Sequence, residues 1–290
     1  MKHSVLSMML LAASLFTLMS CNKTDYISPD KENEVENLKL IKTFSDNGFK
    51  VELFNSSGQL VVGYNKIFLR LTDKSGNYIS NASVNWLPMM TMNMNGMIKS
   101  HSCPFSGITK TANKQTLFEG YIVFVMASNE PGDSWNLKIN FTAGGQTIDI
   151  NDKVNVVSTI SQFQKLYTSV TGNDGMTYML AFVEPANPRV GINDFVAGLF
   201  YKGENGDFPI AGNYKIKVDS RMPGMGNHSA MGNEDMIQGS DGLYHGKVGF
   251  SMTGSWVINM ILQNSSGEVV KGESITETNP ESSLNFKLEF

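Results

Sequence analysis

The sequence predicts an all-β protein built from two tandem sandwich domains. Residues that favour strands and turns dominate the chain, whereas runs of helix-forming residues are scarce. Short apolar stretches alternate with turn sequences that contain Gly, Asn, Asp or Ser, which is the pattern of a β-sandwich. With 290 residues, the chain is also long enough for two domains that each bury a core of their own.

The N-terminus predicts export and a lipid anchor. A positively charged start precedes an apolar run, Val5 to Leu18, which is too short to span a membrane as a helix. The run ends in Leu-Met-Ser-Cys21, which resembles the lipobox of bacterial lipoproteins. The resemblance implies that residues 1–20 are a signal peptide and that Cys21 carries the acyl chains that hold the protein at a membrane. Asn22, by resemblance to the sorting rule of bacteria with two membranes, favours the outer membrane.

The mature chain is expected to begin with a flexible tether. Residues 21–36 are polar and charged, and they contain too few apolar side chains to pack. Strands separated by Gly-containing turns then follow. We predict strands at Phe49–Phe54, Lys66–Leu71, Ser83–Leu87, Leu117–Met126, Trp135–Phe141 and Gln146–Val157.

The second half of the sequence repeats the first. Val62-Gly-Tyr-Asn65 returns 128 residues later as Val190-Gly-Ile-Asn193. Phe118–Met126 returns 126 residues later as Tyr244–Met252, with glycine, a branched residue, phenylalanine and methionine in the same alternating register. A domain duplication explains both offsets. We therefore predict two immunoglobulin-like sandwiches, residues 37–157 and 158–290, with the boundary near Ser158.

Two clusters of sulfur-containing residues stand out in this framework. Half of the 18 methionines lie in them, and every histidine beyond the signal peptide lies in or just after them. The methionines are Met89, Met90, Met92, Met94, Met97, Met222, Met225, Met231 and Met236. Between Pro88 and Ile108 the sequence contains no carboxylate. Thioether, thiolate and imidazole groups together favour Cu(I), because zinc prefers Cys, His and carboxylates and calcium needs oxygen.

Candidate copper ligands follow from these clusters. In the first half they are Met94, Met97, His101 and the unpaired Cys103, and in the second half Met222, Met225, His228 and His245. Core packing is the alternative for the first cluster, since Met90, Met92 and Met94 would share one face of a strand. The second cluster is rich in Gly and Pro and favours a loop. His245 is either a ligand from a neighbouring strand or a solvated side chain.

The repeated motifs carry a resemblance to a known family. A Pro/Met/Gly/His loop, a [Phe/Tyr]-x-Gly-x-[Ile/Val]-x-Phe-x-Met strand and a turn leading to Trp135 or Trp256 resemble the YtkA-like/FixH-like domains. The resemblance covers roughly residues 38–157 and 163–290. It implies small extracytoplasmic β-sandwiches that bind or deliver copper.

Other classes of function have little support in the sequence. The net charge is −4 and no basic stripe is present, which argues against a nucleic-acid partner. No nucleotide-binding loop, zinc-protease motif or Cys-x-x-Cys occurs, so we expect no enzyme. We expect a lipid-anchored Cu(I) chaperone or buffer of the bacterial cell envelope that exchanges copper with another protein. The alternative is a surface module that binds proteins or glycans and holds no metal.

Overall fold

The computed structural model describes residues 26–27, 33–94, 96–129 and 132–290. Across these residues the chain is all-β, with one short 3₁₀ turn as its helical element. The all-β prediction is therefore confirmed. The predicted signal peptide and Cys21 lie outside the described residues. Within the described ranges, no helix combines the length and the apolar character that a membrane crossing requires.

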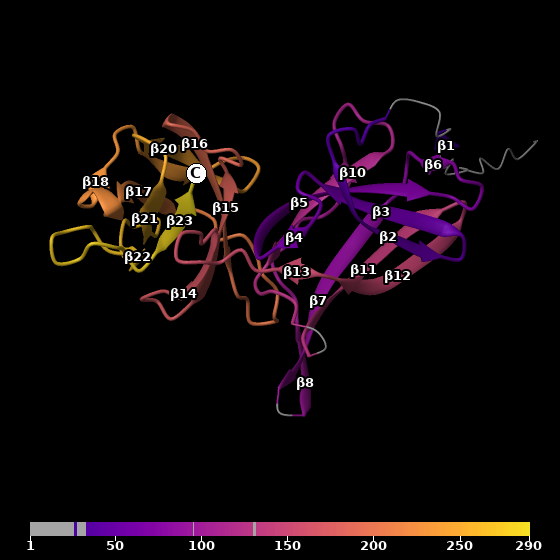
Figure 1. The fold of residues 1–290 in the computed structure, drawn as a ribbon. Coiled ribbons are helices and arrows are strands. Elements are labelled where there is room, and N and C mark those ends of the chain that lie inside the picture. The colour runs from indigo at the N-terminus through magenta and orange to yellow at the C-terminus, as the bar shows by residue number, and fades with distance from the viewer. Residues whose placement is uncertain (1–25, 28–32, 95, 130–131) are drawn as a thin grey trace, which may run out of the picture.

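The first domain is a sandwich of two main sheets (Figure 1). Its strands are β1 (Tyr26–Ile27), β2 (Lys39–Asp46), β3 (Phe49–Asn55), β4 (Leu60–Val61), β5 (Gly63–Thr72), β6 (Tyr78–Ile79), β7 (Val84–Met94), β8 (Met97–His101), β9 (Thr109–Lys110), β10 (Leu117–Phe124), β11 (Ser134–Ala143), β12 (Gln146–Val154) and β13 (Val156–Val157). One sheet places β5 between β3 and β10, and the other has the order β12-β11-β7-β8.

The second domain repeats this order of pairing. Its elements are β14 (Tyr167–Thr171), β15 (Thr177–Glu184), β16 (Gly191–Tyr201), β17 (Lys215–Met222), η1 (Pro223–Met225), β18 (His228–Ser229), β19 (Glu234–Gln238), β20 (Tyr244–Phe250), β21 (Ser255–Gln263), β22 (Val269–Lys271) and β23 (Asn285–Glu289). Strands β16 and β20 pair as β5 and β10 do, and β18-β17-β21 pair as β8-β7-β11 do. Because β19 pairs with both β20 and β17, the two layers here form one continuous sheet.

A tryptophan marks the same place in both cores. Trp135 and Trp256 are buried, and their indole Nε1 groups donate hydrogen bonds to the carbonyl oxygens of Met126 (2.9 Å) and Met252 (3.0 Å). The repeated Phe of the preceding strand packs against each indole, with ring centroids 5.0 Å apart in the first domain and 5.4 Å apart in the second. The repeat seen in the sequence thus corresponds to repeated packing.

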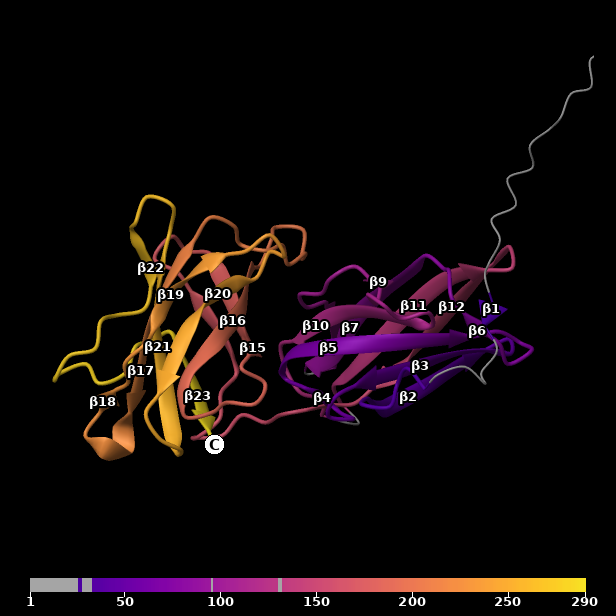
Figure 2. The same cartoon turned by 90° about the horizontal axis from the view of Figure 1, so that it is seen from above.

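The two domains lie side by side, as Figures 1 and 2 show from two directions. Among the described strands, no pairing crosses Ser158. Side chains do cross it, because the apolar core of the first domain continues into Tyr167, Met179 and Phe200 of the second. Tyr121 and Phe200 bring their rings to 6.1 Å across this boundary. The domains therefore share an apolar contact.

Two local predictions need correction. The predicted flexible tether, residues 21–36, contacts the first domain at described residues: β1 pairs with β6, and the Glu34 carboxylate accepts hydrogen bonds from the backbone N–H groups of Gln115 (2.6 Å) and Thr116 (2.7 Å). Residues 21–25 and 28–32 of the tether lie outside the described residues. The strand predicted to end at Leu87 continues to Met94, because β8 pairs with its second half.

Candidate metal-binding hairpins

The first methionine cluster forms a β-hairpin, β7–β8. Its antiparallel register places Met90 opposite His101, Met92 opposite Lys99, and Met94 opposite Met97. Side chains that are directly opposite in such a pair lie on the same face of the sheet. The methionines at alternate positions and the histidine thus line one face of the hairpin, which continues the face that the first part of β7 turns toward the core.

Exposure rises along this face from base to tip. Met90 is 0% exposed, whereas Met94 is 49% and Met97 61% exposed. The third strand of the sheet, β11, reaches only as far as Thr91, so among the described residues the last part of the hairpin pairs only within its own two strands. Figure 1 shows this part extending away from the sandwich. The core-packing alternative therefore holds for Met90, and the tip methionines are open to solvent.

The His101 ring is held in a defined state. Its Nδ1 lies 2.8 Å from the carbonyl oxygen of Ser102, and a carbonyl can only accept, so Nδ1 carries the hydrogen. In the neutral ring, Nε2 then keeps its lone pair, which is the arrangement that a histidine ligand uses. The ring also meets Trp135 edge to face at a centroid distance of 5.7 Å. His101 is thus oriented before any ion arrives.

The second cluster forms the equivalent hairpin, β17–β18. Met222 lies directly opposite His228, as Met90 lies opposite His101. Met222 is 5% exposed, and His228 is exposed beside it. The 3₁₀ turn η1 connects the two strands and carries Met225 on the outside. The prediction of a loop is right for this turn, whereas Met222 belongs to a strand.

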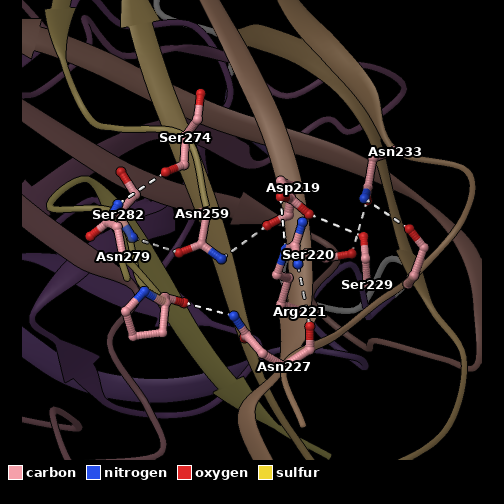
Figure 3. A network of polar contacts seen from close by, with 12 residues as sticks. Asp219, Ser220, Arg221, Asn227, Ser229, Asn233, Asn259, Ser274, Asn279 and Ser282 are labelled. Carbon is pink, nitrogen blue, oxygen red and sulfur yellow. Dashed lines mark hydrogen bonds and ion pairs between the residues drawn. The ribbon is translucent and has the colours of Figure 1, made fainter. Parts of the chain in front are cut away.

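A polar network fixes the second hairpin to its domain (Figure 3). The Asp219 carboxylate accepts hydrogen bonds from Arg221 Nε (2.9 Å) and Ser229 Oγ (3.1 Å). Asn227 donates from its side chain to the carbonyl oxygen of Pro280 (3.0 Å). These bonds hold the residues on both sides of His228, so the imidazole is presented from an anchored loop.

Cys103 does not share this exposed arrangement. The thiol is fully buried in the core of the first domain, and burial raises its pKa. A metal needs the thiolate, which the apolar surroundings disfavour. The structure therefore contradicts the prediction that Cys103 is an accessible ligand beside His101.

His245 is also separate from the second hairpin. Its Nε2 lies 2.9 Å from the Asp241 carboxylate. Across β19, it aligns with the beginning of β17 near Lys215, whereas Met222 is the last residue of β17. Seven residues of strand separate these positions by roughly 20 Å. The prediction of His245 as a ligand from the neighbouring strand is therefore wrong.

The remaining donors are thioethers and single imidazoles. Among the described residues, no three His, Cys, Asp or Glu side chains converge to hold an ion. A metal site at either hairpin must therefore draw on methionine. The sequence identified Met94, Met97, His101, Met222, Met225 and His228 as candidates. It did not single out Met90, whose relation to His101 depends on the register of β7 with β8.

Comparison with known proteins identifies the second domain. Residues 173–260, from the turn after β14 into β21, match the YtkA-like family model. The second domain is YtkA-like. The matched segment of this YtkA-like domain contains Met222, Met225, His228 and Trp256. The predicted resemblance is thus confirmed for residues 173–260 of the second domain.

A solved structure gives a much weaker likeness. The FdeC adhesin of Escherichia coli is similar over 86% of this chain and 65% of its own, with 14% identity and a TM-score of 0.25. This chain therefore spans less than two-thirds of the adhesin structure, and at that TM-score the likeness carries no functional argument. No curated protein sequence matches the chain.

Proposed function

We propose that the protein is an extracytoplasmic, lipid-anchored Cu(I)-binding protein with one site on each hairpin, at the base of β7–β8 and next to the turn of β17–β18. The observation that carries the proposal is the repeated pair: a buried methionine directly opposite a histidine on one face of β7–β8 and again on β17–β18. Side chains opposite one another place their Cβ atoms about 5 Å apart, within reach of one ion. Packing of the core would account for the buried methionines, but it does not require a histidine opposite each of them.

The donor set fits a soft monovalent ion. A thioether and an imidazole favour copper, and neither site offers the carboxylate oxygens that calcium or magnesium needs. The thioether carries no proton, so only the imidazole competes with protons for the ion. Met94 and Met97 add further thioethers at the tip of the first hairpin.

The proposal extends the YtkA-like assignment to the first domain. Equivalent strand order, equivalent tryptophans and equivalent Met–His pairs support a tandem of two such domains. Lipid on Cys21 would place both in the bacterial cell envelope, at the outer membrane. There the protein would take up Cu(I) and pass it to another protein by ligand exchange, without catalytic turnover.

Copper titration of the full-length chain tests this function. Under a competing chelator we expect about two Cu(I) ions per chain, one for each hairpin pair. Met222→Leu combined with His228→Ala should remove one of them, because leucine keeps the buried volume but has no sulfur. His101→Ala should remove the other.

Matched controls separate these losses from general damage. Met236→Leu changes another buried methionine of the second domain, and His245→Ala changes a histidine away from the hairpin. Both variants should keep the full copper content. Unchanged uptake in Met222→Leu/His228→Ala and in His101→Ala would refute the proposed sites.

An exposed apolar tip supports a second candidate, a surface interaction module. Ile98 is 76% exposed at the tip of the first hairpin, next to the exposed Met97. Such a tip could enter an apolar groove of a partner. This function depends on exposed apolar area and does not depend on sulfur. A chain that takes up no Cu(I), and whose partner binding survives Met94→Leu/Met97→Leu but not Ile98→Asp, would establish it.

A further inference from the structure

We propose that the two hairpins divide the work: the first transfers Cu(I) to an acceptor with soft ligands, and the second retains it. This inference rests on the proposed function. It follows from a difference between the two hairpins. The first has a row of thioethers leading from its base to a free tip, whereas the second has an anchored loop.

On the first hairpin, neighbouring thioethers are spaced closely enough for a flexible methionine side chain to span the distance between them. Positions two apart on a strand are separated by about 7 Å. Met90 with His101, then Met92, then Met94 with Met97 occupy three successive steps on one face. Methionine has three rotatable bonds, so its sulfur can follow an ion between neighbouring positions.

The middle step favours passage over binding. Lys99 lies opposite Met92, so this position offers one thioether beside a cation. A positive ion has fewer ligands and an unfavourable neighbour there. It would rest at the base, with His101, or at the tip, with the paired methionines.

The tip can reach an acceptor because little holds it. Beyond Thr91 no described strand pairs with the outside of the hairpin, and Gly96 N donates a hydrogen bond to Asn93 Oδ1 (3.0 Å) near its turn. Weakly supported segments open and move most readily. An acceptor can therefore approach the thioethers of Met94 and Met97 from outside.

The second hairpin lacks both features. Met222 is buried and lies opposite His228. The side-chain hydrogen bonds of Asp219 and Asn227 hold the connecting loop in place. Met225 lies outside on the connecting turn, without a second methionine opposite it. Beyond Met222 and the exposed His228, the described residues of this hairpin offer no second pair of opposed methionines to which an ion could move.

Transfer requires only exchange of ligands. At each step one copper–ligand bond forms as another breaks, first from His101 Nε2 to a thioether and finally from a thioether to the acceptor. Copper stays Cu(I), so no electron is supplied or removed. The neutral imidazole left behind keeps its Nδ1 hydrogen.

Release kinetics of single-site chains test the division of work. In the full-length protein, His228→Ala leaves the first site and His101→Ala leaves the second. Each is loaded with one Cu(I) and mixed with excess bathocuproine disulfonate, a chromogenic chelator. We expect the chain that keeps the first site to release copper about tenfold faster. Adding Met94→Leu and Met97→Leu to it should slow release about fivefold and change the equilibrium affinity less than about twofold.

The outcomes are distinct. Met231→Leu, an exposed change in the second domain, should leave both rates unchanged. Equal release from the two sites, or no slowing by the tip substitutions, would overturn the transfer role while the binding function stands. If neither single-site chain takes up Cu(I), the proposed function itself fails, and the transfer role fails with it.

Discussion

Asn65 and Asn193 perform the same task in the two domains. Each is buried and bonds to the loop that enters the strand: Asn65 to both backbone groups of Val61, and Asn193 to both backbone groups of Arg189. Gly63 and Gly191, the first residues of β5 and β16, adopt φ of +105° and +108°, a conformation that glycine adopts most readily. The repeated Val-Gly-x-Asn sequence is therefore a loop that an amide side chain closes.

Replacing either asparagine should destabilise its own domain. Asn65→Ala or Asn193→Ala leaves loop N–H and C=O groups without their partner, which costs about 2 kcal/mol of unfolding free energy. Denaturant unfolding of each variant measures the loss. Asn151→Ala, on the exposed side of β12, serves as the control. Equal stability of Asn193→Ala and the control would contradict the role of the side chain.

The two hairpins differ at the level of whole elements. In β7–β8 the strand pairing continues past the sheet, and the methionines of the outer part are exposed. In β17–β18 the strand pairing comprises two residue pairs, and side-chain hydrogen bonds hold the connecting loop. A common strand order thus supports one extended and one anchored arrangement.

Asp219 should control the order of the second hairpin. Asp219→Ala removes the acceptor for Arg221 and Ser229, so the β17–β18 pairing should open more often. Hydrogen exchange at the backbone N–H of Ala230, which donates to Ser220, should become about tenfold faster. Global stability should fall by less than about 1 kcal/mol, since the ion pair is partly exposed.

A charge-matched control separates this effect from loss of any surface carboxylate. Asp149→Ala removes a carboxylate that faces Lys138 on the first domain. It should leave exchange at Ala230 unchanged. Unaltered exchange in Asp219→Ala would show that the turn holds its shape without the network.

At the scale of the whole molecule, the boundary between the domains covers the thiol. Cys103 and Phe208 line one groove there, and Phe208 packs on the core that contains Cys103. Burial keeps the thiol protonated by raising its pKa. The reactivity of Cys103 therefore reports how closely the two domains fit.

Shortening the side chain at this boundary should expose the thiol. Phe208→Ala removes apolar cover, so alkylation of Cys103, measured by mass spectrometry of its peptide, should accelerate about tenfold. Ile237→Ala, an exposed change elsewhere on the second domain, should not alter it. Slow alkylation in both variants would mean that the first domain buries Cys103 without help from the second.

Local patterns in the sequence were sufficient for much of this architecture. Strand alternation and turn residues depend on neighbours in the chain, so β3, β5, β10 and β11 could be predicted closely. The paired motifs indicated a duplication, which the order of the strands repeats. The YtkA-like resemblance of the second domain was likewise carried by residues close in sequence.

Tertiary structure alone decided which sulfur atoms are accessible. Met90, Met94 and Cys103 all carry sulfur and lie close together in the sequence. Met90 and Cys103 are nevertheless buried and Met94 is exposed, because burial depends on partner strands and on the adjacent domain. Strand register places Met90 opposite His101 and separates His245 from Met222. No local pattern in the sequence specifies the register between distant segments. The sequence by itself determined the duplicated β framework and its clusters of soft ligands; long-range pairing decided which of those ligands meet, because contacts between remote strands set both register and burial.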